Sequence, residues 1–165
     1  MTTPHPSTLR STYLVHGTDP DQLETLRRSR IDHHGLPVQP FKDAAGDWPL
    51  RCCLADSRPG EMLAIIGWSP FPWNGAYRMS GPVVIHADGC PTAPNGALPP
   101  AFQERRQILR CYDGSHLQIY DLAVLVEPGD GLGAALDAIF ADPRVELVQS
   151  FNVLAGCWSF TAARH

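Results

Sequence analysis

Short runs of apolar residues separated by prolines and glycines organise the first half of the chain. A helix is expected from Pro20 to about Arg30, because Asp19 is a suitable N-cap and proline favours the first helical position. Residues 31–49 contain repeated Gly and Pro and predict irregular structure. Residues 62–66 are apolar throughout, which is typical of a central strand covered on both faces. Strands are expected at about 13–16, 50–55, 61–68 and 82–86.

The second half of the chain predicts hairpins around one amphipathic helix. Residues 131–141 predict that helix, because Leu132 and Leu136 fall on one face together with other apolar residues. Asp113-Gly114 between two apolar runs is a strong hairpin signal. Further elements are expected as strands at 108–112, 116–126, 144–152 and 156–163, and as a short helix near 99–106.

Hairpin-linked strands with two or three helices indicate an α+β fold. We expect a mostly antiparallel sheet or an incomplete β-barrel, in which the strands from residue 61 onward share one sheet and the 131–141 helix packs on one face. Residues 1–10 are polar with two prolines and predict a disordered lead-in, so residues 11–165 are expected to form a single domain. The segment 88–100 contains four prolines and is expected to be a lid loop.

Composition narrows the classes of function. Hydrophobic residues make up 44% of the 165 residues, enough to build a core without metal or disulfide staples. The net charge is −4, so the chain lacks a basic footprint for nucleic acid. The N-terminus lacks the apolar core of a signal peptide, and Met62–Trp68 is too short to span a bilayer. We therefore expect a cytoplasmic protein with its five cysteines reduced and no nucleic-acid or membrane partner; a homodimer is left open.

Several short motifs occur in a characteristic order: Arg51-Cys52-Cys53-Leu54, Ser80-Gly81-Pro82 leading to His86 and Cys90, Ala141-Asp142-Pro143-Arg144-Val145, and Gly156-Cys157. Over roughly residues 50–164 the chain resembles a bacterial family of small proteins known only as a domain of unknown function. The resemblance implies a bacterial cytosolic protein and carries no particular activity. The family's closing segment commonly reads His-x-His-Asn, where this chain has Gln149-Ser150-Phe151-Asn152. If family members use that histidine pair for a metal or for proton transfer, the resemblance implies that this chain has lost or altered that role.

Two residues are the candidates for chemistry. His86 ends a predicted strand, where a side chain is held rigidly, and imidazole exchanges protons near neutral pH. We expect His86 to act as a proton donor or acceptor. Arg51 lies in an otherwise apolar run, where a charge needs a partner. Arg51 either pairs with Glu61 or Asp56, or holds the carboxylate or phosphate of a substrate as a second catalytic-site residue.

Other residues are expected to line a substrate pocket. Strand alternation places Gln149 on an apolar face, where it is either a core amide satisfied by hydrogen bonds or a group that orients the substrate. A buried cysteine such as Cys90 or Cys157 often serves only as a small hydrophobic residue. Aromatic residues in loops, such as Trp73 and Tyr77, often only cover the core. The expected substrate-binding residues are Gln149, Asn152, Cys90, Cys157, Trp73 and Tyr77.

A metal site is not expected, although some residue types suit one. The side chains whose types match zinc are His86, Cys90, Cys53 and Cys157. The chain lacks a Cys-x-x-Cys pair, so we expect neither a metal nor another cofactor.

Two functions follow from these residues. The first is a small enzyme, or an enzyme-like pocket, that acts on a small organic substrate by proton transfer through His86. The alternative is a binding module without chemistry, whose aromatic loop at 68–77 contacts a small molecule or a partner protein. The first function requires His86, Arg51 and Gln149 to open into one cavity.

Overall fold

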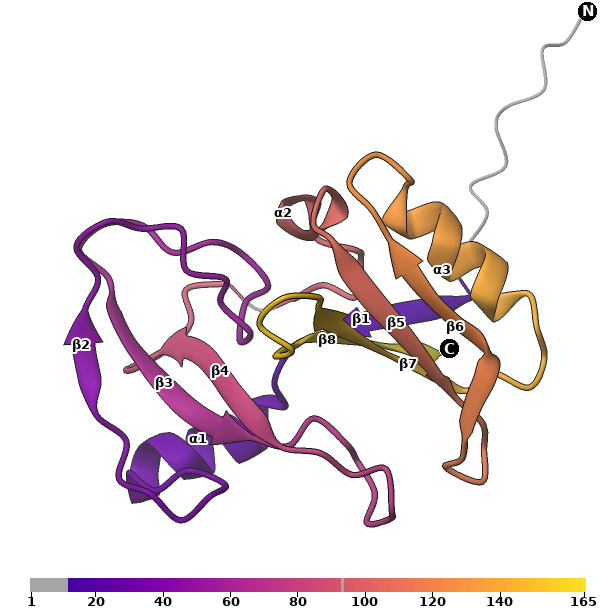
Figure 1. The fold of residues 1–165 in the computed structure, drawn as a ribbon. Helices are drawn as coiled ribbons and strands as arrows, with labels where there is room; N and C mark the ends of the chain where they lie inside the picture. The colour runs from indigo at the N-terminus through magenta and orange to yellow at the C-terminus, as the bar shows by residue number, and fades with distance from the viewer. Residues whose placement is uncertain (1–11, 93) are drawn as a thin grey trace, which may run out of the picture.

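The computed structural model describes residues 12–92 and 94–165 (Figure 1). The disordered lead-in expected at residues 1–10 lies outside these residues. The elements follow one another as β1 (Tyr13–His16), α1 (Pro20–Ser29), β2 (Pro40–Lys42), β3 (Met62–Trp68), β4 (Gly81–His86), α2 (Pro100–Gln103), β5 (Gln107–Tyr112), β6 (Gln118–Val126), α3 (Leu132–Phe140), β7 (Leu147–Asn152) and β8 (Trp158–Arg164).

The strands form two antiparallel sheets rather than one. The larger sheet has the order β1-β8-β7-β5-β6, and the smaller has the order β2-β3-β4. Neither sheet closes into a barrel, and the fold is broadly α+β. The expectation of a single sheet was wrong because β3 pairs with β2 on one side and with β4 on the other, and neither β3 nor β4 pairs with the hairpin strands that follow them. Figure 1 shows the two sheets side by side, with α1 against the smaller one and α3 against the larger.

The larger sheet is stabilised by α3, as the sequence predicts. Four residues of the apolar stripe, Leu132, Leu136, Ile139 and Phe140, are buried in one cluster with residues of the large sheet such as Val148 and Phe160. Helix α1 begins as expected, because the Asp19 side chain accepts a hydrogen bond from the Gln22 backbone N–H at 2.8 Å.

A second apolar cluster joins the two sheets. It contains Leu63 and Ile85 from the small sheet, Leu26 from α1, and Phe151 and Trp158 from the large sheet. Burial of this shared core holds the sheets against each other. The two-sided burial expected for residues 62–66 is only partial, since Ile65 of β3 is 50% exposed.

The segment expected as a strand at 50–55 is a turn, and this correction matters for the site. Leu50 makes a single parallel bridge to Val84 of β4, and the chain then turns through residues 51–53. Leu54 has a φ of 55°, which is incompatible with a continuing strand. Strand β2, in contrast, forms inside the segment expected to be irregular.

Arg51 at the start of this turn links three parts of the fold. Its backbone N–H donates to the Val84 carbonyl at 2.8 Å, and its carbonyl accepts from the Thr18 N–H at 2.8 Å. Its side-chain Nε donates to the Trp158 carbonyl of β8 at 2.6 Å. The approach of Gly17 to Arg51 is so close that a Cβ on Gly17 would lie 2.3 Å from the Arg51 carbonyl oxygen.

Within the described part of the chain, no helix has both the length and the apolar character needed to cross a bilayer.

We expect Gly17→Ala to destabilise the fold by about 1–3 kcal/mol, because its methyl group would collide with backbone that cannot retreat without breaking the hydrogen bonds of Arg51. Urea unfolding followed by circular dichroism measures this change. Gly81→Ala is the matched control, since nothing lies within 4 Å of a Cβ built there. Equal stabilities for the two variants would contradict the role assigned to Gly17.

Candidate functional site

The end of β4 brings His86 to a group of cysteines. His86 pairs across the sheet with Leu63, and Glu61 immediately precedes β3, so the Glu61 side chain reaches the imidazole. The turn that follows Arg51 is fastened to β4 and carries Cys52 and Cys53 to the other side of the same ring.

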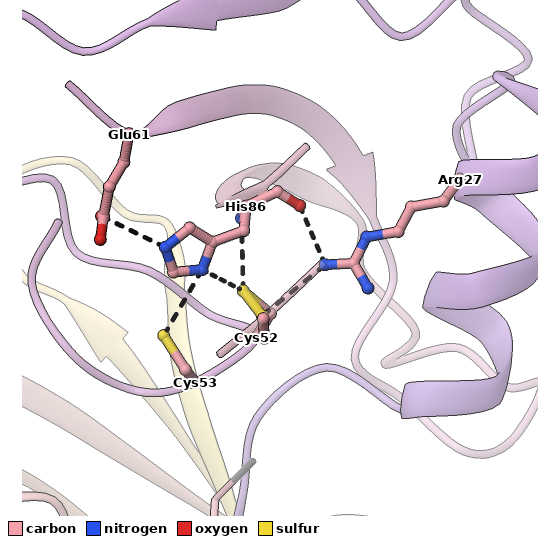
Figure 2. The surroundings of a disulfide bond; sticks show 6 residues. Arg27, Cys52, Cys53, Glu61 and His86 are labelled. Atoms are coloured by element: carbon pink, nitrogen blue, oxygen red, sulfur yellow. Dashed lines mark hydrogen bonds and ion pairs between the residues drawn. A yellow bond between two sulfur atoms is a disulfide. The ribbon is translucent and has the colours of Figure 1, made fainter. Parts of the chain in front are cut away.

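The imidazole of His86 has a different partner at each nitrogen. Nδ1 lies 3.6 Å from Cys52 Sγ and 3.9 Å from Cys53 Sγ. Nε2 lies 3.2 Å from Glu61 Oε2. Figure 2 shows the ring between the carboxylate on one side and the two cysteines on the other. Both ring nitrogens are therefore engaged, and the ring orientation is fixed.

Cys52 and Cys90 form a disulfide, contrary to the expectation that all five cysteines are reduced. The bond joins residues separated by 38 positions, with Cα atoms 6.5 Å apart. It fastens the loop after β4 to the turn that follows Arg51. Closing a loop of this length stabilises a fold by roughly 2–4 kcal/mol.

Arg27 of α1 places a positive charge beside this cluster. Its Nη2 donates to the His86 carbonyl at 2.9 Å and lies 3.6 Å from Cys90 Sγ. Its Nε is buried without a hydrogen-bond partner among the described residues. Burial lowers the pKa of Arg27, while the charges of Glu24 and Asp88 oppose that shift.

Glu61 and Cys53 are held in defined protonation states. The backbone N–H of Arg58 lowers the pKa of Glu61, and the hydrogen bond from His86 adds to this effect, so Glu61 is a carboxylate. Burial raises the pKa of Cys53, and the Glu61 charge raises it further. Cys53 is consequently a thiol near neutral pH, and a thiol is a poor nucleophile.

Arg51 has its own surroundings, separate from Cys52, Cys53 and Cys90. Its side chain is only 2% exposed, and Nη1 donates to the Pro49 carbonyl at 3.0 Å while Nη2 lies 3.6 Å from Cys157 Sγ. The acidic partners expected for it are occupied elsewhere, since Glu61 contacts His86 and Asp56 pairs with Arg105.

A cavity of about 320 Å³ lies beside Arg51. Arg51 and Asn152, both expected as site residues, share this cavity. The other lining residues that carry charge or hydrogen-bonding groups are Asp47, Arg105, Arg106 and Ser159. Neither Arg105 nor Arg106 was singled out in the sequence, because only the fold brings the short segment before β5 to the turn at Arg51.

The family model described as "Protein of unknown function (DUF1203)" matches residues 47–164. The chain belongs to the DUF1203 family. This match confirms the resemblance drawn from the short motifs. Cys52, Cys53, Glu61, His86 and Cys90, which together form the cysteine–histidine cluster, lie inside the family domain, as does the Arg51 cavity. Arg27 lies before the domain. No curated protein and no solved structure matches the chain.

Gln149 of this DUF1203 protein is a core amide and does not line the Arg51 cavity. Its Oε1 accepts hydrogen bonds from Trp158 Nε1 at 2.6 Å and from Thr161 Oγ1 at 2.8 Å. Its Nε2 lies 3.4 Å from the Pro70 carbonyl oxygen. The structure thus places His86, Arg51 and Gln149 in three different surroundings, so it does not bring them into one cavity.

The aromatic residues expected to wall the pocket pack against Tyr112 instead. The ring centroids of Trp73 and Tyr77 lie 5.7 Å and 6.0 Å from that of Tyr112. Trp73 also stacks on His116 at 4.3 Å. These contacts assign Trp73 and Tyr77 to a small apolar cluster beside the large sheet.

The sequence does not predict three of the residues that surround His86, namely Cys52, Glu61 and Arg27. Neither Cys52 nor Arg27 is singled out by the sequence as a site residue, and Glu61 is expected there only as a partner of Arg51. Of these three residues, only the position of Glu61 could have been predicted. Glu61 begins the expected strand 61–68 and His86 ends the expected strand 82–86, and the ends of two paired antiparallel strands lie close together.

Gln149→Leu is expected to lower the free energy of unfolding by about 1–3 kcal/mol for each donor it leaves unsatisfied, namely the Trp158 indole and the Thr161 hydroxyl. Chemical unfolding measures the loss. Gln103→Leu, at an exposed position of α2, serves as control and should change little. A fully stable Gln149→Leu protein would show that these hydrogen bonds contribute nothing.

The thiol of Cys111 should resist alkylation in the folded protein at mildly alkaline pH. Burial raises its pKa to about 12, so the reactive thiolate is scarce until the pH approaches that value or the protein unfolds. Iodoacetamide labelling followed by peptide mass spectrometry tests this, with labelling in urea as the positive control. Rapid modification of Cys111 in the native state would contradict its burial.

Proposed function

We propose that this DUF1203 protein binds a small anionic molecule in the cavity beside Arg51. The observation that carries this proposal is the buried guanidinium of Arg51. Among the residues that the structure describes, no carboxylate lies within ion-pair distance of it. A buried charge without an opposite charge is costly, and an anionic ligand in the adjoining cavity would supply that charge.

The hydrogen-bonding capacity of Arg51 supports this proposal. A guanidinium has five N–H donors. In Arg51 the described acceptors are the carbonyl oxygens of Trp158 and Pro49 and the sulfur of Cys157. Two N–H groups therefore remain for a ligand. A carboxylate or phosphate oxygen suits them, because the planar fork of arginine matches the geometry of those groups.

Three of the four charged residues that line the cavity are arginines and the fourth is Asp47, so positively charged side chains predominate there. Arg105 and Arg106 add positive charge at the rim, although each is paired with an acidic residue, Asp56 and Glu127 respectively. Asn152 and Ser159 add neutral hydrogen-bonding groups. A volume of about 320 Å³ lies at the lower end of the range for small-molecule sites.

We favour binding without catalysis over the proton-transfer enzyme. The imidazole of His86 faces Glu61 and the cysteines, and the lining residues of the Arg51 cavity do not include it. A histidine must reach the substrate to exchange a proton with it. The cytoplasmic location, the bacterial source and the homodimer stay predictions.

Malonate and inorganic phosphate are suitable probes for this site. We expect each to raise Tm, because a ligand that binds only the folded state stabilises it. In Arg51→Lys, malonate and phosphate should raise Tm no more than sodium chloride does at equal ionic strength. Lysine keeps the positive charge but lacks the planar guanidinium that binds two oxygens at once. The same loss is expected in Arg105→Gln, which leaves the buried network of Arg51 in place.

Arg28→Gln is the matched control, because Arg28 lies on the exposed side of α1, where it pairs with Glu24. This variant should respond like the unmodified protein. A Tm rise that persists in both Arg51→Lys and Arg105→Gln, or that chloride reproduces, would overturn the proposed site.

A further inference from the structure

We propose that the reduced protein binds one Zn²⁺ ion through the thiolates of Cys52, Cys53 and Cys90 and the Nδ1 atom of His86. The four ligand atoms already lie within 4.8 Å of one another. This site is distinct from the Arg51 cavity and does not depend on it. It also differs from the zinc set considered in the sequence, because Cys52 takes the place of Cys157.

The spacing of the ligand atoms fits a tetrahedral zinc centre. Zn–S bonds of about 2.3 Å and Zn–N bonds of about 2.0 Å place sulfur and nitrogen ligands about 3.5 Å apart. His86 Nδ1 lies 3.6 Å from Cys52 Sγ and 3.9 Å from Cys53 Sγ. An ion therefore fits between these three atoms with little movement of the backbone.

The groups around the ligands are those that a zinc centre requires. Glu61 Oε2 lies 3.2 Å from Nε2 of His86, so the carboxylate holds the ring with Nδ1 facing the cysteines. The backbone N–H of His86 donates to Cys52 Sγ at 3.3 Å, an interaction that stabilises a thiolate. Three thiolates, one neutral imidazole and Zn²⁺ carry a net charge of −1, which the guanidinium of Arg27 balances from 3.6 Å.

The disulfide and the metal centre exclude each other, because Cys52 and Cys90 take part in both. A dithiol supplies two electrons and two protons and becomes a disulfide itself, whereas a phosphine supplies the two electrons and becomes a phosphine oxide, with its oxygen and the two protons taken from water. Either reductant converts the Cys52–Cys90 bond into two thiols. Binding of Zn²⁺ then displaces the protons of the three thiols. Two sulfur ligands of a tetrahedral zinc ion lie about 3.8 Å apart. After reduction, Cys52 Sγ and Cys90 Sγ can reach this separation by side-chain rotation alone, since their Cα atoms are already 6.5 Å apart.

The ligand chemistry selects the class of ion. Three sulfur donors and one imidazole suit zinc and exclude Mg²⁺ and Ca²⁺, which prefer oxygen ligands. A set of four protein ligands without an open position is typical of a structural centre rather than a catalytic one. In this protein the ion would tie together the turn after Arg51, the end of β4 and the loop that follows it.

The test uses the full-length protein, reduced with a phosphine under anaerobic conditions and loaded with Zn²⁺ or with Co²⁺ as a spectroscopic probe. We expect one ion per chain after removal of excess metal, and the intense visible absorption of tetrahedral cobalt with sulfur ligands. The oxidised protein should retain no ion. A reduced, folded protein that retains none, or a cobalt spectrum typical of octahedral oxygen ligands, would overturn the proposal.

Variants separate the metal centre from a general effect on the fold. Cys53→Ser removes one ligand but leaves the disulfide intact, so its oxidised form shows whether the variant folds. We expect Cys53→Ser and His86→Ala to lose the cobalt signal, and Glu61→Gln to bind the ion about 10- to 100-fold more weakly.

Cys111→Ser is the matched control, because it removes a thiol outside the cluster while its hydroxyl can donate to the Leu122 carbonyl as the thiol does. It should bind the ion like the unmodified protein. Unchanged binding in folded Cys53→Ser and His86→Ala would place the ion elsewhere and refute the assigned ligands.

Discussion

Arg51 is the residue on which the arrangement of this protein depends. Its backbone N–H binds β4 of the small sheet, its side chain binds the Trp158 carbonyl of β8 in the large sheet, and its carbonyl binds the connection between β1 and α1. Three segments distant in sequence are thus fixed to one residue. A buried arginine is costly to keep, so its hydrogen bonds to backbone carbonyls are what allow the charge to stay inside the protein.

The two candidate sites follow from the turn that begins at this residue. Arg51 directs its guanidinium toward the large sheet and the cavity near Asn152. The next two residues, Cys52 and Cys53, lie against the imidazole of His86 at the end of β4. A strand at this place would have put Arg51 and Cys53 on one face. The turn instead gives neighbouring residues separate environments, and this is why a single pocket expected from the sequence became two sites.

Local signals in the sequence predicted local structure well. Asp19 and Pro20 begin α1, the apolar stripe with Leu136 builds α3, and Asp113-Gly114 lies in the connection between β5 and β6. The division into two sheets depends on pairing between distant strands, which periodicity does not encode. The burial of Gln149 followed from alternation, but its partner Trp158 did not, because a bulge shifts the register between β7 and β8. The Cys52–Cys90 pair could not be read from spacing, because only the fold brings the turn at residues 51–53 beside the loop after β4.

The pairing of β1 with β8 determines when the fold can be completed during synthesis. β1 pairs along its length with β8, from Tyr13 opposite Arg164 to His16 opposite Thr161. During synthesis β1 therefore has no strand to pair with until β8 has left the ribosome. The small sheet and the residues of the cysteine–histidine cluster emerge earlier, but their shared core waits for Phe151 and Trp158. The fold is thus expected to be completed only once β7 and β8 have left the ribosome, with apolar surface exposed until then.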